Sequence, residues 1–335
     1  MKNTRLVRLT DNGLFCEIGG FYIDPNKAVD KALITHAHSD HARPGSRSYL
    51  TVKQGELLLK QRLGQRINLL TVRYKEAIYL NGVKVSFYPA GHILGSAQIR
   101  IEYKGEVWVI SGDYKIEKDF TCDKFEPVKC NTFITESTFG LPIFKWISQT
   151  NLFENINSWW RKNKDSGTAS VIFGYALGKA QRIISGLDPS IGTIYTHNSI
   201  GLINQCYRDS GVNLPPTKDI GEISNEKITP GIMIVAPPTA DRLQWTDKFP
   251  DISSAFASGW MQIRKNRKRN SFDRGFPLSD HADWEGLQRA IKESEADKIL
   301  ITHGYSSQLS KWLCENGYDA GILETSLKRV GENGL

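Results

Sequence analysis

Three of the seven histidines in this 335-residue sequence fall within six positions, in the stretch His36-Ala-His38-Ser-Asp40-His41. The apolar residues 32–34 precede the stretch and predict the end of a buried strand. Alternation on an extended segment directs His36 and His38 to the same side. A tight turn would bring Asp40 and His41 back toward that point, so two adjacent metal ions could be held. Imidazole and carboxylate ligands suit Zn²⁺, and also Mn²⁺ or Fe²⁺. The alternative is a polar loop that happens to be rich in histidine.

The His-x-His-x-Asp-His pattern resembles the second motif of the metallo-β-lactamase fold, and further motifs of that family follow in its order. Asp24, in Phe-Tyr-Ile-Asp-Pro, resembles the first-motif aspartate that braces the ligand loop; the alternative is a turn aspartate before proline. His92, in Ala-Gly-His-Ile-Leu-Gly, resembles the third-motif histidine. Asp113, in Ile-Ser-Gly-Asp-Tyr, resembles the fourth-motif aspartate, which bridges two metal ions in that family.

A second set of motifs resembles the β-CASP branch of this superfamily, whose members are nucleases. Glu136 in Thr-Glu-Ser-Thr-Phe-Gly, His281 in Ser-Asp-His-Ala-Asp and His303 in Ile-Thr-His-Gly resemble its motifs A, B and C. Residues 176–182, Ala-Leu-Gly-Lys-Ala-Gln-Arg, resemble a helix start that recurs in this branch. As a whole, the chain is most similar to the bacterial ligase-associated DNA exonucleases, which are Artemis-related.

The resemblance implies two divalent metal ions, with Zn²⁺ expected and Mn²⁺ as the alternative. The first ion would be held by His36, His38 and His92, the second by Asp40, His41 and His303, and Asp113 would bridge them. Two ions about 3.5–4 Å apart clamp the attacking and leaving oxygens of a phosphoryl displacement and lower the pKa of bound water toward about 7. The expected reaction is therefore phosphodiester hydrolysis by an activated hydroxide.

Three residues are expected to take part in catalysis directly: Asp40, His281 and Glu136. His281 is the candidate acid that protonates the leaving oxygen, and Glu136 would accept a hydrogen bond from its other ring nitrogen, which favours the imidazolium. The alternative role for His281 is stabilisation of charge in the transition state. Asp24 is expected to orient a ligand or the loop backbone without touching the metal. His197 has no such context and is expected at the surface.

Contacts to substrate phosphates are expected from hydroxyls, a helix start and a basic run. Ser137 and Thr138 follow the motif A acid, and Lys179 opens a helix whose amides would favour an anion. The alternative for Lys179 is an ordinary basic helix start. Residues 264–274 hold six cations and one Asp, among them Arg264, Lys265 and Arg267. This run would track phosphates where the chain crosses back between domains, or would form a solvated face.

Composition sets only broad limits on the class of protein. A net charge of +7 is compatible with a polyanionic partner such as DNA or RNA. No apolar run approaches the roughly 20 residues of a membrane span, and no hydrophobic stretch follows the N-terminal Met-Lys-Asn-Thr-Arg, so a cytoplasmic location is expected. The five cysteines are widely spaced, with no Cys-x-x-Cys pair, and predict reduced thiols.

The fold class expected is α/β, a metallo-β-lactamase αββα sandwich with an inserted β-CASP α/β domain. Residues 1–144 and 263–335 would form the sandwich, and residues 145–262 the insertion. Strands are expected within 5–24, at 29–35, in hairpins over 77–88 and 97–111, and at 170–173, 193–196, 231–236 and 252–257. Helices are expected at 52–63, 150–163, 178–187 and 199–209. Alternation of strands and helices after residue 145 predicts a largely parallel sheet.

The function expected is that of a DNA exonuclease or processing nuclease, acting in repair with a ligase and a helicase. A ribonuclease is the main alternative, because a motif C histidine such as His303 is more characteristic of the RNA-processing members of the branch. A catalytically silent nucleic-acid-binding subunit is disfavoured because every expected ligand is present. A small-molecule hydrolase is disfavoured by the long insertion and the basic run.

Overall fold

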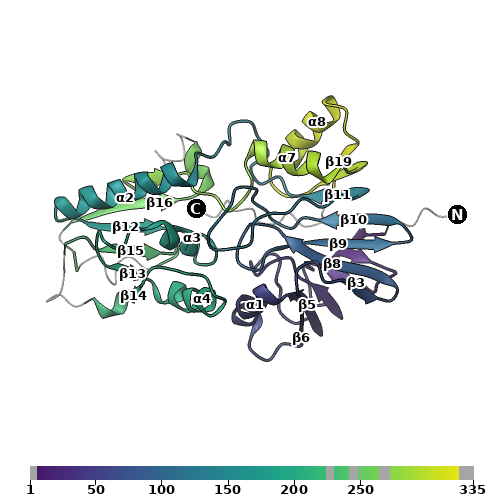
Figure 1. Cartoon of the computed structure of the whole chain (residues 1–335), viewed down its shortest axis with the longest axis horizontal. Coiled ribbons are helices and arrows are strands. Elements are labelled where there is room, and N and C mark those ends of the chain that lie inside the picture. Colours follow the sequence, from purple (N-terminus) through teal and green to yellow (C-terminus); the bar gives the residue numbers. More distant parts are fainter. Residues whose placement is uncertain (1–5, 224–229, 241–247, 250, 264–271, 324–335) are drawn as a thin grey trace. The chain divides into compact units, whose positions relative to one another are not determined.

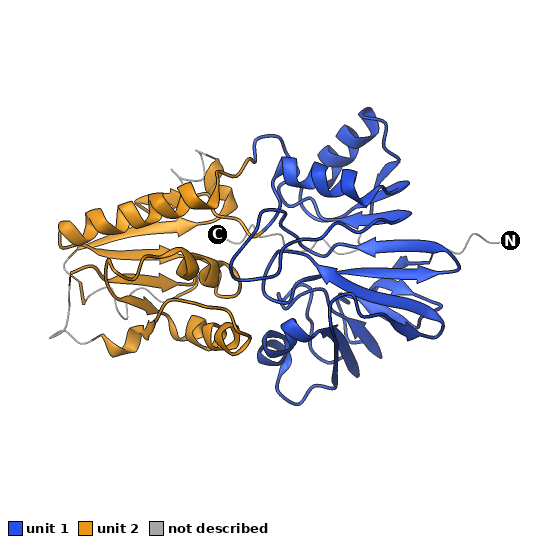
Figure 2. Ribbon diagram, in the orientation of Figure 1, with its two compact units in different colours: residues 1–144, 281–335 blue, residues 145–280 orange. Residues whose placement is uncertain are grey.

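The computed structural model describes residues 6–223, 230–240, 248–249, 251–263 and 272–323. The chain divides into two compact units, residues 1–144 with 281–335 and residues 145–280 (Figure 2). The chain returns to the first unit after residue 280 and not after residue 262, so the predicted end of the inserted domain was wrong. The physical reason is that β17 (Arg274–Phe276) pairs in parallel with β16 (Ile252–Ala257) and so belongs to the sheet of the inserted unit.

The first unit is built on two sheets (Figure 1). The first sheet runs in the order β1 (Arg8–Thr10), β2 (Gly13–Cys16), β3 (Phe21–Ile23), β4 (Lys31–Leu33), β5 (Ser48–Val52) and β6 (Leu69–Val72). The second runs in the order β19 (Ala320–Ile322), β18 (Lys298–Ile301), β11 (Thr132–Thr135), β10 (Glu106–Ile110), β9 (Ala97–Tyr103), β8 (Val83–Pro89) and β7 (Ile78–Leu80).

One apolar layer lies between these sheets and a second lies under the C-terminal helices. Alternation along β8 buries Val83, Val85 and Phe87 in the layer that also takes side chains from β3, β5 and β9. The helices α7 (Trp284–Ser294) and α8 (Ser306–Glu315) cover the opposite face of the second sheet through residues such as Leu287 and Leu309 (Figure 1). With α1 (Glu56–Leu63) beside the first sheet, these layers give the αββα sandwich.

The helix predicted over residues 52–63 is shorter than expected. Val52 completes β5, and residues 53–55 form the 3-10 turn η1 (Lys53–Gly55), so α1 begins only at Glu56. The apolar spacing that predicted a longer helix includes a strand end, whose buried residues have a different period.

The inserted unit has one parallel sheet, in the order β14-β13-β15-β12-β16-β17. Its elements along the chain are α2 (Gln149–Asp165), β12 (Ala169–Phe173), α3 (Lys179–Gly186), β13 (Ile194–Thr196), α4 (Asn198–Asp209), β14 (Lys218–Asp219), η2 (Ile220–Glu222), β15 (Met233–Ala236), β16, η4 (Gly259–Gln262) and β17. The longest helix, α2, starts because the Ser148 hydroxyl accepts from the Asn151 amide, and it buries a stripe that includes Ile156 and Trp160. None of the helices in the described part of the chain has the length and apolar character that a bilayer crossing requires.

Parallel pairing in the first unit brings several strand ends to one edge. β11 pairs in parallel with β10 on one side and with β18 on the other. In the first sheet, β3, β4 and β5 are also parallel to one another. Because the carboxyl ends of parallel strands meet at the same edge of a sheet, the loops after these strands are neighbours. These loops carry most of the residues that the sequence singles out.

Candidate metal centre

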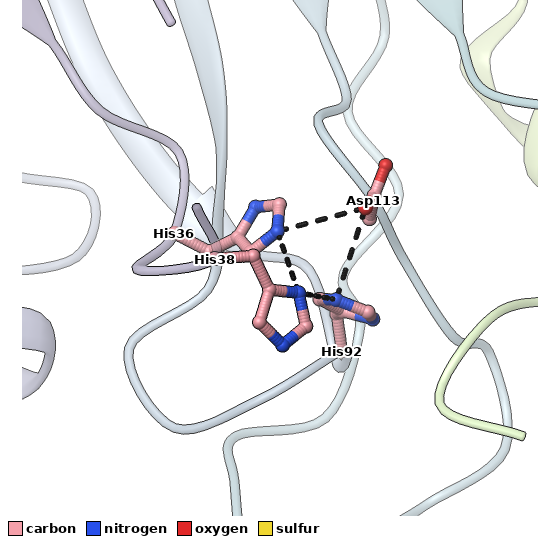
Figure 3. A group of neighbouring side chains, drawn as sticks. All are labelled: His36, His38, His92 and Asp113. Carbon is pink, nitrogen blue, oxygen red and sulfur yellow. Dashed lines mark hydrogen bonds and ion pairs between the residues drawn. The ribbon is translucent and has the colours of Figure 1, made fainter. Parts of the chain in front are cut away.

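Four side chains form the first group of ligands: His36 and His38 after β4, His92 between β8 and β9, and Asp113 after β10 (Figure 3). His38 Nδ1 lies 3.1 Å from His36 Nε2 and 3.0 Å from His92 Nε2. Asp113 Oδ2 lies 3.5 Å from His36 Nε2 and 3.9 Å from His92 Nε2. Each residue offers one ligand atom, and all four atoms lie within 4.8 Å of one another, which is the spacing of ligands around a shared ion.

A second group shares the same aspartate. His41, Asp113 and His303 also place one ligand atom each within 4.8 Å of the others. Asp113 Oδ2 lies 3.4 Å from His41 Nε2, and Asp113 Oδ1 lies 3.9 Å from His303 Nδ1. Asp40 Oδ2 lies 3.5 Å from His41 Nε2, and the Asp40 side chain is 49% exposed, so it is the most open of the predicted ligands at this group. Asp113 Oδ2 therefore lies beside ligands of both groups, and Asp113 Oδ1 lies nearest His303.

The ligand loop is braced by Asp24, which ends β3. Its carboxylate accepts from the Thr35 amide at 2.8 Å, from the Thr35 hydroxyl at 2.6 Å and from His41 Nδ1 at 2.7 Å. The Thr35 oxygen lies 3.0 Å from His36 Nδ1. These contacts engage Nδ1 of His36 and His41 and leave Nε2 of both rings facing Asp113. In metal sites, a carboxylate commonly holds one ring nitrogen of a histidine in this way while the other nitrogen binds the metal. The alternative of a simple turn aspartate does not account for three hydrogen bonds to the ligand loop.

The motif B histidine lies beside the first group. His281 Nδ1 lies 2.9 and 3.1 Å from the two carboxylate oxygens of Glu136, and both side chains are buried. Glu136 Oε1 also accepts from the Tyr114 amide at 2.7 Å. The His281 ring is 4.6 Å from the His92 ring, measured between centroids. Glu136 therefore holds the Nδ1 side of the His281 ring.

Burial and charge set the protonation of the ligands. Burial lowers the pKa of His36 well below its ordinary value, and the imidazoles of His41 and His92 lower it further. Burial would raise the pKa of Asp113, but the His41 imidazole outweighs it and holds that pKa well below its usual range. Burial would lower the pKa of His41, but the carboxylates of Asp113, Asp40 and Asp24 raise it well above its ordinary value. His36 is thus a neutral ligand and Asp113 an anionic one at neutral pH.

The residues present fit a pair of divalent ions. Among the described residues, His41 Nε2 is buried without a hydrogen-bond partner, a costly state that a bound cation would relieve. The donors are imidazole nitrogens and carboxylate oxygens, which suit Zn²⁺ or Mn²⁺. The two groups meet at Asp113, so the ions they would hold are adjacent. The structure thus brings together His36, His38, His41, His92, Asp113 and His303, with Asp40 at the margin.

Two of the residues predicted to contact phosphate are buried and have other partners within the protein. The Ser137 hydroxyl is fully buried and donates to the backbone carbonyl of His303. Lys179 is 2% exposed, and its ammonium lies 3.1 Å from the carboxylate of Asp280. Thr138 is half-buried and forms a hydrogen bond with Glu136. Burial raises the pKa of Glu136, and the hydrogen bond from Thr138 lowers it by a smaller amount. Arg264, Lys265 and Arg267 lie outside the described residues.

The sequence analysis does not identify several residues that hold the predicted site residues in place. Thr35 was overlooked although it lies next to His36, and a hydroxyl directly before a ligand histidine is a signal that could have identified it. Arg182 lies within the motif at residues 176–182, and its guanidinium is buried and donates to the Ser279 carbonyl. Asp280 directly precedes His281 and pairs with Lys179. The partners of Arg182 and Asp280 lie about a hundred residues away in the chain, and no local pattern connects them.

Comparisons with known proteins agree with this site. No family model matches the chain. It is 25% identical over 312 residues to a probable DNA ligase of Opitutus terrae, a match that covers 92% of this chain and 30% of that protein. It is 32% identical over 120 residues to the endoribonuclease YSH1 of Yarrowia lipolytica, covering 35% of this chain and 14% of that protein. It is 26% identical over 200 residues to an RNase J-like protein of Methanocaldococcus jannaschii, covering 52% and 47%.

A solved structure supports the fold. A protein of unknown function from Enterococcus faecalis V583 superposes with a TM-score of 0.58 and 13% identity, covering 88% of this chain and 79% of that one. The αββα sandwich and the histidine–aspartate centre at its strand ends define the metallo-β-lactamase class. With its inserted α/β unit and these relatives, the chain resembles the β-CASP branch of the metallo-β-lactamase superfamily. It spans less than half the length of each of the three curated relatives named above.

Proposed function

We propose that the chain is a metal-dependent nuclease that hydrolyses phosphodiester bonds in DNA. The observation that carries the proposal is the convergence of two ligand groups on Asp113, with the His281–Glu136 pair beside them. Two divalent ions, with Zn²⁺ proposed, would neutralise charge on the phosphate oxygens and supply a nucleophile by lowering the pKa of water.

The protein residues would position the reactants and handle the proton. Glu136 accepts from His281 Nδ1, so Nε2 is the atom proposed to protonate the leaving oxygen. Stabilisation of transition-state charge by the same imidazolium is the alternative role. Asp24 and Thr35 keep the ligand loop in place, so His36 and His41 need no rearrangement to bind metal.

DNA is proposed as the substrate because of the relative in Opitutus terrae. That protein is named a probable DNA ligase, and nearly the whole of this chain aligns with about a third of it. A nuclease segment joined to a ligase would trim ends before they are sealed. We therefore propose a role in DNA repair, in the cytoplasm, with a ligase and a helicase as working partners.

Ribonuclease activity is the second candidate. The endoribonuclease YSH1 and the RNase J-like protein are both relatives, and His303 matches the motif C histidine more characteristic of RNA-processing members. The two candidates share the same centre and differ in how the sugar and the strand are recognised.

The test compares end-labelled DNA and RNA of one sequence, in single- and double-stranded form, with Zn²⁺ and with Mn²⁺. We expect faster degradation of DNA, and loss of all activity in folded Asp113→Ala. Faster degradation of RNA would favour the second candidate. Cleavage by folded Asp113→Ala at the unmodified rate would exclude the proposed centre as the source of activity.

A further inference from the structure

Ser137 connects the ends of two neighbouring strands of the first unit. It follows Glu136 at the end of β11 and contacts the loop that carries His303 after β18. Its hydroxyl donates to the His303 carbonyl, with the Thr302 carbonyl 3.3 Å away. Its own carbonyl accepts from the Tyr305 amide at 2.9 Å. Ser137 is fully buried, so these contacts are protected from water.

The loop that Ser137 contacts has an unfavourable backbone conformation. His303 has φ 61° and Gly304 has φ 58°, so two consecutive residues lie in the left-handed region. A side chain strains the backbone there, and such a conformation persists only where its surroundings enforce it. The loop also lies directly on Ser137, because a Cβ added to Gly304 would be 2.3 Å from the Ser137 carbonyl oxygen. Ser137 is therefore the neighbour that fixes the backbone of His303.

We propose that Ser137 is a positioning residue for His303 and thereby controls whether the second metal ion is bound. This inference rests on the proposed metal centre. Fixing the His303 carbonyl sets the direction of its imidazole, which lies 3.9 Å from Asp113 Oδ1. The first group of ligands is held by the loops after β4, β8 and β10, so its ion should bind without help from Ser137.

The experiment titrates the metal-free protein with Zn²⁺ against a chromophoric chelator and counts bound ions by elemental analysis. In Ser137→Ala we expect the affinity for the second ion to fall about 10- to 100-fold, as for other residues that hold a ligand in place, with the first ion unchanged. The matched control is Ser294→Ala. Ser294 is also buried in this unit, and its hydroxyl donates to the Ile291 carbonyl at 2.7 Å within α7, so both affinities should be unchanged.

The outcomes separate this inference from the proposed centre. Wild-type affinity for both ions in Ser137→Ala would overturn the inference, and so would an equal loss of both ions. Fewer than two ions on the unmodified protein would instead count against the metal centre. If Ser137→Ala does not fold, Gly304→Ala tests the same contact by a change in the loop that carries His303. The added Cβ would displace this loop from Ser137. A folded Gly304→Ala that keeps the second ion at full affinity would also overturn the inference.

Discussion

Asp113 is the residue on which both halves of the centre depend. One of its oxygens faces His36 and His41, and the other faces His303. Its carboxylate stays ionised despite burial because His41 holds its pKa well below the usual range. A buried carboxylate with imidazoles on two sides and a shifted pKa is typical of a functional site. Its position in both ligand groups fits the bridging role that we propose for it.

At this scale, the seven histidines are not equivalent. His303→Ala removes a ligand from the second group, and we expect the nuclease rate to fall by several orders of magnitude. His197 is half-buried, and its ring nitrogen accepts from the Ser199 amide at 3.3 Å to cap α4, so His197→Ala should keep nearly the full rate. Initial rates on labelled DNA, with folding checked by circular dichroism, measure the difference. Similar rates for the two variants would contradict the ligand assignment.

The helix α3 shows how secondary-structure elements support the site indirectly. Lys179 and Arg182 in this helix hold Asp280 and the Ser279 carbonyl, the two residues directly before His281. All four residues belong to the inserted unit, and His281 begins the returning part of the first unit. The helix start expected to bind phosphate therefore holds the segment that leads into the motif B histidine.

The Lys179–Asp280 pair gives a prediction about the stability of this element. Removing one partner leaves a buried charge unpaired, so Lys179→Met should lower the free energy of unfolding by about 3–5 kcal/mol, measured by urea titration. Lys179→Met combined with Asp280→Asn should recover part of that loss. The control is Arg161→Met: its partner Asp188 lies at 2.9 Å, but both side chains are substantially exposed, and we expect a much smaller loss of stability. A loss no larger in Lys179→Met than in the control would show that the pair is not stabilising.

Prediction from the sequence worked best where a motif is local. The stretch from His36 to His41 sits on a strand end whose apolar residues are adjacent to it, so pattern and position agree. The role of Ser137 could not be predicted, because its hydrogen-bond acceptor is 166 residues away and is a backbone carbonyl, which any residue carries. The return boundary failed for a similar reason: β17 is three residues long, and its strand partner, not its own sequence, assigns it to the inserted sheet.

On the scale of the whole molecule, all the predicted metal ligands belong to the first unit. Ions that bind only the folded chain stabilise it by mass action, by about 2.7 kcal/mol at a hundredfold excess over Kd. Chelation should therefore lower the melting temperature. Chelation should lower the melting temperature more at pH 8 than at pH 6. The pKa of His41 is raised in the metal-free protein, and the proton on its ring must leave before an ion can bind.

Differential scanning calorimetry with and without a chelator, at both pH values, checks this prediction. His41→Ala serves as the control, since it removes the titrating ligand and should abolish most of the pH dependence of the metal effect. An equal effect of chelation at pH 6 and pH 8 would contradict the role assigned to His41.

The order of the ligands along the chain has a consequence for biosynthesis. The first group is complete once residue 113 has folded, but the second awaits His303, which β18 delivers by pairing with β11. Translation must pass through the whole inserted unit in between. A polypeptide still emerging from the ribosome therefore lacks a residue of the second group, and a prematurely terminated product never gains it. Unfinished copies would thus lack the complete centre that we propose for phosphodiester hydrolysis.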